Sequence, residues 1–361
     1  MKLFSFFLPQ FHQIPENDEW WGEGFTEWVN VKNAKPLFQG HQQPLIPINE
    51  NYYNLLDKDI VQWQTELMHK YGIYGMAYYH YYFQGKLLLE KPAENLLQWK
   101  DINQPFFFCW ANHTWRRTWE GSQTILLEQT YGDIDAWEEH FQYLVPFFRD
   151  SRYEKKDNCP LFMIFNPRFS EKNEMINYFD KRCKDYGFSG IWIIECSHGK
   201  KTEIDSLKKN KPVQNHSILL REPEYSKIKY YESEETSKWS LCKHTINKHL
   251  QCVINKEKSC VTCFSNNALF NEKIKYYRPS GDLLQCLCFS WDNTPRHGKR
   301  GYIIDSVDKK HFMKYMDTIK QEEFCFINAW NEWAEGMILE PTEQNGYQYL
   351  EWIKEWIDHN G

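Results

Sequence analysis

The segment Phe324-Cys325-Phe326-Ile327-Asn328-Ala329-Trp330-Asn331-Glu332-Trp333-Ala334-Glu335-Gly336 begins as an apolar run and ends with two carboxylates three residues apart. A short β-type run that leads into a polar, aromatic turn ending at glycine is how an α/β barrel presents catalytic side chains. Paired carboxylates can protonate a glycosidic oxygen and act on its reaction partner, and indole rings stack on sugars. The segment therefore predicts a carbohydrate site with Glu332 and Glu335 as its catalytic pair. The alternative is two solvated loop acids beside core tryptophans.

The same alternation of strand and helix recurs along the chain. Helical candidates carry apolar residues at helical spacing, and two of them stop at Gly72 or Gly187. Strand followed by helix, repeated about eight times, predicts a (β/α)8 TIM-like barrel of the α/β class, with a doubly wound open sheet as the alternative. The predicted strands are Leu3–Leu8, Gly75–Tyr79, Phe106–Trp110, Leu161–Phe165, Ile191–Cys196, Ser217–Leu220, Leu284–Trp291 and Phe324–Ala329. The predicted helices are Asp59–Tyr71, Asp135–Phe148, Lys172–Tyr186, Lys309–Lys320 and Tyr347–Ile357.

Two segments interrupt this alternation. Residues 10–53, after the first strand, are too many for an ordinary βα loop and too aromatic for a flexible linker, so we expect an ordered lid or site wall. Residues 222–282 are polar and rich in Lys and Glu, and we interpret them as an insertion near barrel units six and seven. The chain length suits one large domain, so we predict a single catalytic barrel over residues 1–361.

The composition favours a carbohydrate partner over other classes. The 361 residues include 16 Trp, 22 Tyr and 24 Phe, and such rings pack well on the apolar CH faces of sugars. The net charge is -6 without a basic stripe, so nucleic acid is not an expected partner. We identify neither a signal peptide nor an apolar run near the ~20 residues of a membrane span. The eleven cysteines are scattered, which is typical of reduced thiols in a cytoplasmic protein.

Aromatic and polar side chains gather after five of the predicted strands. The strand ends of a barrel meet at one rim, so we expect these clusters to converge there, although any one of them could be an ordinary packed strand end. We predict that substrate is bound by Gln10, His12, Trp21 and Glu27 after the first strand, Tyr79 and His80 after the second, Trp110, Asn112 and Trp115 after the third, Trp291 and Asp292 after the seventh, and Trp330, Asn331 and Trp333 after the eighth.

Several longer motifs occur together along nearly the whole chain. They are Leu8-Pro9-Gln10-Phe11-His12, Asn17-Asp18-Glu19-Trp20-Trp21-Gly22, Gly24-Phe25-Thr26-Glu27-Trp28, Tyr78-Tyr79-His80-Tyr81, Cys109-Trp110-Ala111-Asn112, Trp291-Asp292-Asn293-Thr294-Pro295-Arg296 and Asn328–Gly336. With these motifs the chain resembles the WbsX-type proteins of bacterial surface-polysaccharide clusters, which are labelled glycosyltransferases. That family is similar to glycoside hydrolase family 99, the endo-α-1,2-mannosidases and mannanases, which are (β/α)8 barrels. The resemblance is weakest over residues 222–282.

The resemblance to the hydrolases implies roles for the two acids. Glu335 would be the acid/base at the glycosidic oxygen, and Glu332 would take the proton from the sugar 2-hydroxyl, so that O2 attacks the anomeric carbon. This substrate-assisted route retains the anomeric configuration. The hydrolases have His where this chain has Ala334, so the substrate need not be their mannosides. Glu27 is either a further site acid or a salt-bridge partner within the long segment.

Three functions remain open: a glycosidase-like enzyme acting on a surface polysaccharide or its lipid-linked precursor at the membrane, a glycosyltransferase, and a glycan-binding barrel without turnover. No GxGxxG or P-loop motif is present, and Asp133-Ile134-Asp135 is more typical of a helix cap than of a metal site. We therefore favour a hydrolase-like site that needs no cofactor or metal. The cysteines Cys242, Cys252, Cys260 and Cys263 are spaced too irregularly to favour zinc over a plain polar insertion. The sequence specifies neither the sugar nor the oligomeric state.

Overall fold

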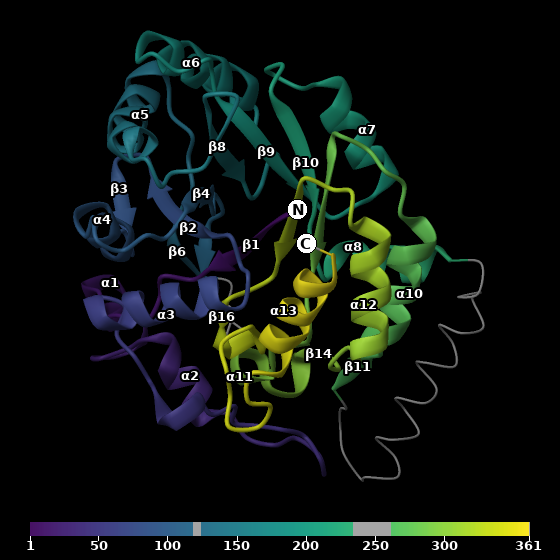
Figure 1. Cartoon of the computed structure of the whole chain (residues 1–361). Helices are drawn as coiled ribbons and strands as arrows, with labels where there is room; N and C mark the ends of the chain where they lie inside the picture. The colour runs from purple at the N-terminus through teal and green to yellow at the C-terminus, as the bar shows by residue number, and fades with distance from the viewer. Residues whose placement is uncertain (118–123, 234–260, 361) are drawn as a thin grey trace.

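Eight parallel strands form a closed ring at the centre of the computed structural model, which describes residues 1–117, 124–233 and 261–360 (Figure 1). The hydrogen-bonded order is β1-β15-β12-β10-β9-β8-β4-β2, and β2 pairs with β1 to close the ring. The predicted (β/α)8 barrel is confirmed, and the open-sheet alternative is wrong, because an open sheet would leave β1 and β2 unpaired. The barrel strands are β1 (Lys2–Phe7), β2 (Gly75–Phe83), β4 (Phe106–Trp110), β8 (Cys159–Ile164), β9 (Trp192–Ser197), β10 (His216–Leu220), β12 (Leu283–Leu287) and β15 (Phe324–Ile327).

Helices surround the ring and bury their apolar faces against it (Figure 1). Each of the five predicted helices is present within a few residues of its predicted bounds. Asp133 is the N-cap of α5, where its side chain accepts a hydrogen bond from the backbone N–H of Ala136, so it acts as the cap that its position favoured. The longer helices are α3 (Lys58–Lys70), α4 (Lys91–Gln98), α5 (Ile134–Arg149), α6 (Lys172–Asp185), α7 (Lys201–Lys209), α8 (Glu224–Glu232), α10 (Asn266–Tyr276), α12 (Lys309–Ile319) and α13 (Gln348–Asn360).

Aromatic rings fill the interior of the barrel. Phe4 of β1 contacts Phe107 of β4, with ring centroids 5.2 Å apart, although β2 separates the two strands in the ring. Phe107 likewise lies 6.2 Å from Phe326 of β15. These contacts cross the inside of the ring, so this end of the barrel is a packed core and not a pore. Closer to the carboxyl ends of the strands, the ring of Phe6 stacks on that of Tyr79, with ring centroids 5.5 Å apart. This pair forms the floor of the cavity described below.

Residues 10–53 form an ordered part of the structure, as the sequence predicts. They include two short helices, α1 (Pro15–Trp21) and α2 (Glu27–Asn33), and the turn η1 (Ile48–Glu50). Trp28 fixes α2 in place: its indole donates to the carbonyl of Tyr53 at 2.8 Å, and its ring packs 5.4 Å from that of Trp333. The segment is therefore held directly against the loop that carries the two catalytic candidates.

Short elements occupy the remaining loops. They are β3 (Lys86–Leu88), β5 (Trp115–Arg116), β6 (Ile125–Leu127), β7 (Lys155–Lys156), β11 (Thr262–Phe264), β13 (Trp291–Asp292), α11 (Thr294–His297), η2 (Gly298–Arg300), β14 (Tyr302–Ile304), β16 (Asn331–Glu332), η3 (Trp333–Glu335) and β17 (Met337–Ile338).

The predicted insertion at residues 222–282 is only partly described. Its described parts hold α8, β11 and α10, and α10 packs against both α8 and α12. Cys242, Cys252 and Cys260 fall outside the described residues, while Cys263 is exposed. The division of the chain into a barrel with an insertion therefore stays a prediction. Within the described ranges, no helix is both long and apolar enough to cross a membrane.

Candidate active site

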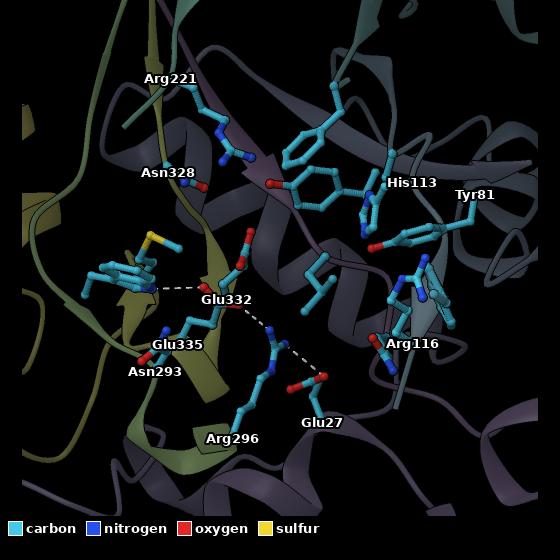
Figure 2. Close-up of a pocket in the computed structure, with 18 of the residues that line it drawn as sticks. Glu27, Tyr81, His113, Arg116, Arg221, Asn293, Arg296, Asn328, Glu332 and Glu335 are labelled. Atoms are coloured by element: carbon cyan, nitrogen blue, oxygen red, sulfur yellow. Dashed lines mark hydrogen bonds and ion pairs between the residues drawn. The ribbon is translucent and has the colours of Figure 1, made fainter. Parts of the chain in front are cut away.

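The carboxyl ends of the barrel strands open into a cavity of about 500 Å³ (Figure 2). Residues on β2 and residues that follow β1, β4, β8, β10, β12 and β15 line it, together with side chains of the long segment. This is the end of the barrel at which enzymes of this architecture carry their active sites, and the volume suits a small ligand or a few sugar units.

A tight hairpin presents the two acids to this cavity. Glu332 lies on β16, which pairs with β17, and Glu335 ends the turn η3 between them. Gly336 closes the turn with a φ of 60°, and a Cβ atom there would lie 3.2 Å from Asp292. Asn331 anchors the hairpin to the end of β1, since its side-chain amide accepts from the N–H of Leu8 and donates to the carbonyl of Leu8. The hairpin is thus fixed on both sides of the acids.

Glu335 is held by two donors. One carboxylate oxygen accepts a hydrogen bond of 2.9 Å from the indole nitrogen of Trp291, and the other is ion-paired with Arg296. Arg296 also lies 2.9 Å from a carboxylate oxygen of Glu27, which is fully buried. Figure 2 shows Arg296 between Glu335 and Glu27. One buried cation therefore links an acid from the long segment to an acid from the last barrel loop.

Glu332 has a different environment. Its side chain is buried, and burial together with the charge of Glu335 raises its pKa to about 8, against the opposing influence of Arg296, Tyr79 and Arg221. With its pKa raised in this way, Glu332 favours its protonated form near neutral pH. A protonated acid beside an ionised one is the equipment for acid–base chemistry.

Arg221 and Asn328 form the wall on the other side of Glu332 (Figure 2). Arg221 follows β10, stacks 4.2 Å over the ring of Phe165 and lies 3.1 Å from Glu224. Asn328 donates to the carbonyl of Glu222, and its buried side-chain oxygen has no partner among the described residues. His113 also lines the cavity, where desolvation and the nearby Arg221 lower its pKa to about 4 and favour a neutral ring.

The structure brings half of the predicted site residues together in this cavity. They come from the long segment, from β2, from the loop after β4, from β13 and from the catalytic hairpin. The predicted residues that line the cavity are Gln10, Trp21, Glu27, Tyr79, Trp115, Trp291, Glu332 and Glu335.

The tryptophans of the last loop do not line the cavity. Trp330 and Trp333 are fully buried, and both indoles donate to the carboxylate of Glu340, at 2.9 and 2.7 Å. Asn331 is also buried and bonded to Leu8. The expectation that these three side chains bind substrate is therefore corrected, since they hold the hairpin that carries the acids.

Three further predicted residues also face away from the cavity. Trp110 is buried and donates to the carbonyl of Tyr82. His80 contacts His140 of α5 at 2.9 Å, and burial lowers the pKa of His80 to about 3, so its ring is neutral. Asn112 uses its side-chain amide on the backbone of Asn166. All three lie between the strands and the outer helices or in loop anchors, so they are not placed to touch substrate.

His12 and Asp292 lie in other hollows. His12 belongs to the long segment and lines a separate hollow, where burial lowers its pKa to about 4. Asp292 points away from the cavity and accepts hydrogen bonds from Gln43 and Thr294, with His41 at 2.8 Å. Neither residue lines the site, and Asp292 anchors the long segment through His41 and Gln43.

Several cavity residues are absent from the predicted set. Some of them could have been predicted from their position inside or beside the strand-end clusters, namely Arg296, Tyr81 and His113. Arg221 follows the weakest of the predicted strands, and nothing in its local sequence marks it. The cavity residues outside the predicted set that carry polar groups are Tyr81, His113, Thr114, Arg116, Arg221, Glu224, Asn293, Arg296 and Asn328.

Two solved structures of similar fold carry glycoside-hydrolase descriptions. The endo-alpha-mannosidase of glycoside hydrolase family 99 from Bacteroides thetaiotaomicron aligns with a TM-score of 0.55 and 13% identity, over 99% of this chain and 97% of that chain. A glycoside hydrolase-like protein aligns with a TM-score of 0.59 and 12% identity, over 98% of this chain and 93% of that chain. At such identities the likeness shows the shared fold.

Sequence comparison gives the family. Two proteins named uncharacterized protein WxcX, from two strains of Xanthomonas campestris pv. campestris, are 29% and 30% identical over 97% of this chain. The alignment covers 48% of each, so the chain spans about half the length of these relatives. The family model described as Glycosyltransferase WbsX matches residues 3–353. The chain therefore belongs to the WbsX family of carbohydrate-active enzymes, and it shares its fold with the glycoside hydrolase family 99 enzyme.

Proposed function

We propose that the protein acts on glycosidic bonds of a bacterial surface polysaccharide, with retaining, hydrolase-like chemistry at Glu332 and Glu335. The observation that carries this proposal is the pair itself. One short hairpin presents two carboxylates of unlike environment to a single cavity, one held by a cation and the other favouring its protonated form. Proton donation to a leaving oxygen together with proton removal from an attacking hydroxyl needs such a pair.

The walls of the cavity suit a sugar chain. Trp21, Trp115 and Trp291 offer aromatic surface from three different loops, and Tyr79 and Tyr81 add hydroxyl groups. A pyranose buries its CH faces on such rings and directs its hydroxyls to the polar groups between them. We expect an endo-acting enzyme, as the resemblance to the endo-mannosidases implies.

A second candidate is a glycosyltransferase of lipopolysaccharide or capsule synthesis. The description of the matching family favours it. In that case the same cavity would hold the acceptor glycan, and the acids would activate its hydroxyl. A glycan-binding barrel without turnover is the third candidate. For each of them we expect an oligo- or polysaccharide partner, including a lipid-linked precursor met at the cytoplasmic side of a membrane.

A product assay separates these candidates. Surface polysaccharide from the organism that makes this protein is incubated with wild type, Glu332→Gln and Glu335→Gln, without sugar nucleotides, and the products are sized and examined by NMR. Shorter glycans from wild type alone support the glycosidase and the pair. No cleavage, followed by chain growth after sugar nucleotides are added, refutes the glycosidase and supports the transferase. Glycan binding that persists in both variants, with no product under either condition, supports the third candidate.

Glu351→Gln serves as the matched control. Glu351 is an exposed acid on the outer helix α13, so its substitution makes the same chemical change away from the cavity. Its activity should equal that of wild type.

A further inference from the structure

Lys227 lies among three aromatic rings beside the catalytic cavity. It belongs to α8, and its ammonium nitrogen lies 4.8 Å from the ring centre of Tyr302, 5.0 Å from that of Trp291 and 5.5 Å from that of Phe264. Trp291 is itself part of the cavity wall. The cation is therefore placed at the edge of the site, where the negative faces of the rings attract it.

The ammonium of Lys227 has no acceptor in the part of the chain that the structure describes. Its side chain is half-buried, and neither an ion pair nor a hydrogen bond joins its nitrogen to a described residue. Ring faces attract a cation, but they do not replace the hydrogen bonds of its three N–H groups. Those donors are thus available to a ligand that reaches this edge of the cavity.

Two cations share one carboxylate at this edge. Glu224 lies one turn before Lys227 on α8 and also lines the cavity. One of its carboxylate oxygens lies 3.1 Å from the guanidinium of Arg221, so Glu224 has its ion-pair partner there. Its charge attracts Lys227 only at longer range. The three side chains together carry one excess positive charge, which favours an anionic ligand.

Tyr302 gives the same edge an exposed aromatic surface. β13 and β14 pair in antiparallel orientation with Trp291 opposite Ile304, so Tyr302 lies diagonally across from Trp291 on the same face. The rings of Trp291 and Tyr302 are nearly parallel, with an interplanar angle of 5° and centroids 6.1 Å apart. Because Tyr302 is 41% exposed, its ring can pack on the CH face of a sugar that extends out of the cavity past Trp291.

We propose that Lys227 and Tyr302 form an outer subsite for an acidic sugar of the polysaccharide. The pyranose ring lies against Tyr302, and the ammonium of Lys227 binds the carboxylate or phosphate group of that sugar. The inference rests on the proposed function, because it extends the binding of the same glycan from the cavity to its edge. It adds the substrate class, which is a polysaccharide whose repeating unit carries a negative charge.

Charge complementarity favours an acidic sugar over a neutral one. A sugar lying on Tyr302 excludes water from the neighbouring ammonium, and this loss of hydration weakens binding unless a counter-charge replaces the water. A carboxylate or phosphate supplies that charge together with strong acceptors. Arg296, deeper in the cavity, already faces Glu27 and Glu335, so an anionic group has less to gain there (Figure 2).

The test compares three preparations of one glycan. Fragments of the surface polysaccharide of the organism that makes this protein are used untreated, after reduction of carboxyl groups with carbodiimide and borohydride, and after removal of phosphate with cold hydrogen fluoride. Binding is measured by calorimetry in the Glu332→Gln background, so that the glycan is not consumed. We expect the untreated fragments to bind about tenfold tighter than one treated preparation, which identifies the acid as a carboxylate or a phosphate.

Variants assign this preference to the subsite. Lys227→Gln should weaken binding of the untreated fragments about tenfold and abolish the preference, whereas Lys227→Arg should keep it. Tyr302→Ala should weaken binding of all three preparations, and Tyr302→Phe, which keeps the ring, should not. Lys310→Gln, which removes an exposed cation on the outer helix α12, is the matched control and should leave every affinity unchanged.

Three outcomes would overturn the inference. The first is equal affinity for the untreated fragments and both treated preparations. The second is a Lys227→Gln variant that keeps the full preference. The third is a Tyr302→Ala variant with unchanged affinities, and because Tyr302 is exposed, this variant keeps the inference testable if Lys227→Gln does not fold.

The binding assay and the cleavage assay fail separately. Cleavage by wild type without any preference for the untreated fragments refutes the subsite alone. A preference that depends on Lys227, without cleavage by wild type, supports the subsite and refutes the glycosidase alone.

Discussion

The indole nitrogen of Trp333 lies 2.7 Å from a carboxylate oxygen of Glu340. The same buried carboxylate accepts hydrogen bonds from Trp330 at 2.9 Å, Tyr53 at 2.8 Å and Gln64 at 2.6 Å. Four donors from the last barrel loop, the long segment and α3 thus meet at one acid. Glu340 joins the catalytic hairpin to the rest of the rim, which makes its tryptophans part of the support of the site.

Replacing Glu340 by Gln should therefore destabilise the protein. A glutamine keeps one acceptor oxygen but turns an NH2 group toward donors, so at least one buried indole or hydroxyl loses its partner. We expect the free energy of unfolding to fall by roughly 2–4 kcal/mol, measured by urea denaturation. Glu351→Gln is the exposed control and should change it by less than about 0.5 kcal/mol. Equal values for the two variants would show that the four-donor contact contributes little.

The stability of Glu332→Gln should depend on pH in a defined direction. The folded chain raises the pKa of Glu332 from 4.5 to about 8, so it binds this proton more tightly than the unfolded chain does. Wild-type stability therefore falls as pH rises through that window, and glutamine removes this loss. We expect the variant to be more stable than wild type by on the order of 1–3 kcal/mol near pH 8 and by much less near pH 5.

Glu335→Gln provides the contrast for this measurement. Its carboxylate is paired with Arg296 and Trp291, so its loss leaves a buried cation with less compensation and should lower the free energy of unfolding. Thermal and urea denaturation at both pH values would measure the two variants together. A Glu332→Gln variant that is less stable than wild type at the higher pH would contradict the raised pKa.

Side-chain alternation explains much of what the sequence did and did not reveal about the site. On β2, Tyr79 lines the cavity while its neighbour His80 contacts α5. On β16, Glu332 faces the cavity and Asn331 faces away from it. On β13, Trp291 faces the cavity and Asp292 faces away from it. Adjacent residues on a strand point to opposite faces, so only one residue of each predicted pair of neighbours lines the cavity. The second strand was predicted to end at Tyr79, and because it continues to Phe83 the alternation extends to Tyr81.

The ring itself was predictable because its eight strands are short, apolar and separated by helical patterns. The hydrogen-bond partners of the tryptophans in the last barrel loop could not be predicted. Trp330 and Trp333 satisfy every local criterion for a sugar-binding residue, and only the return of the chain to Glu340 reveals their structural role. Arg221 reaches the cavity because β10 ends beside β12 in the ring, a spatial relationship that its polar sequence neighbours do not encode.

Trp21 and Trp110 should separate ligand binding from stability. Trp21 is half-buried and lines the cavity, so Trp21→Ala should weaken binding of a glycan fragment about tenfold, as measured by calorimetry, with little loss of stability. Trp110 is buried behind the strands, so Trp110→Ala should lower the free energy of unfolding by roughly 3–5 kcal/mol. Unchanged glycan affinity in Trp21→Ala would remove Trp21 from the binding surface.

His41 and Asp292 should be energetically coupled. The ring nitrogen of His41 lies 2.8 Å from the Asp292 carboxylate, and Gln43 donates to the same oxygen at 2.6 Å. Burial alone would raise the pKa of Asp292, but hydrogen bonds from His41, Thr294 and Gln43 lower it below its ordinary value. The stabilising contribution is thus present at neutral pH and is lost as pH falls through the folded-state pKa.

A double-mutant cycle with His41→Ala and Asp292→Asn tests this contact. Asparagine presents an NH2 group to donors, so the single variant should lose about 1–3 kcal/mol at neutral pH, and trypsin should cleave the segment around His41 faster. If the two side chains stabilise each other, His41→Ala should cost less in the Asp292→Asn background, with a coupling of about 1 kcal/mol that shrinks in acid. Strict additivity at neutral pH would mean that the long segment is held at this point by Gln43 and by packing alone.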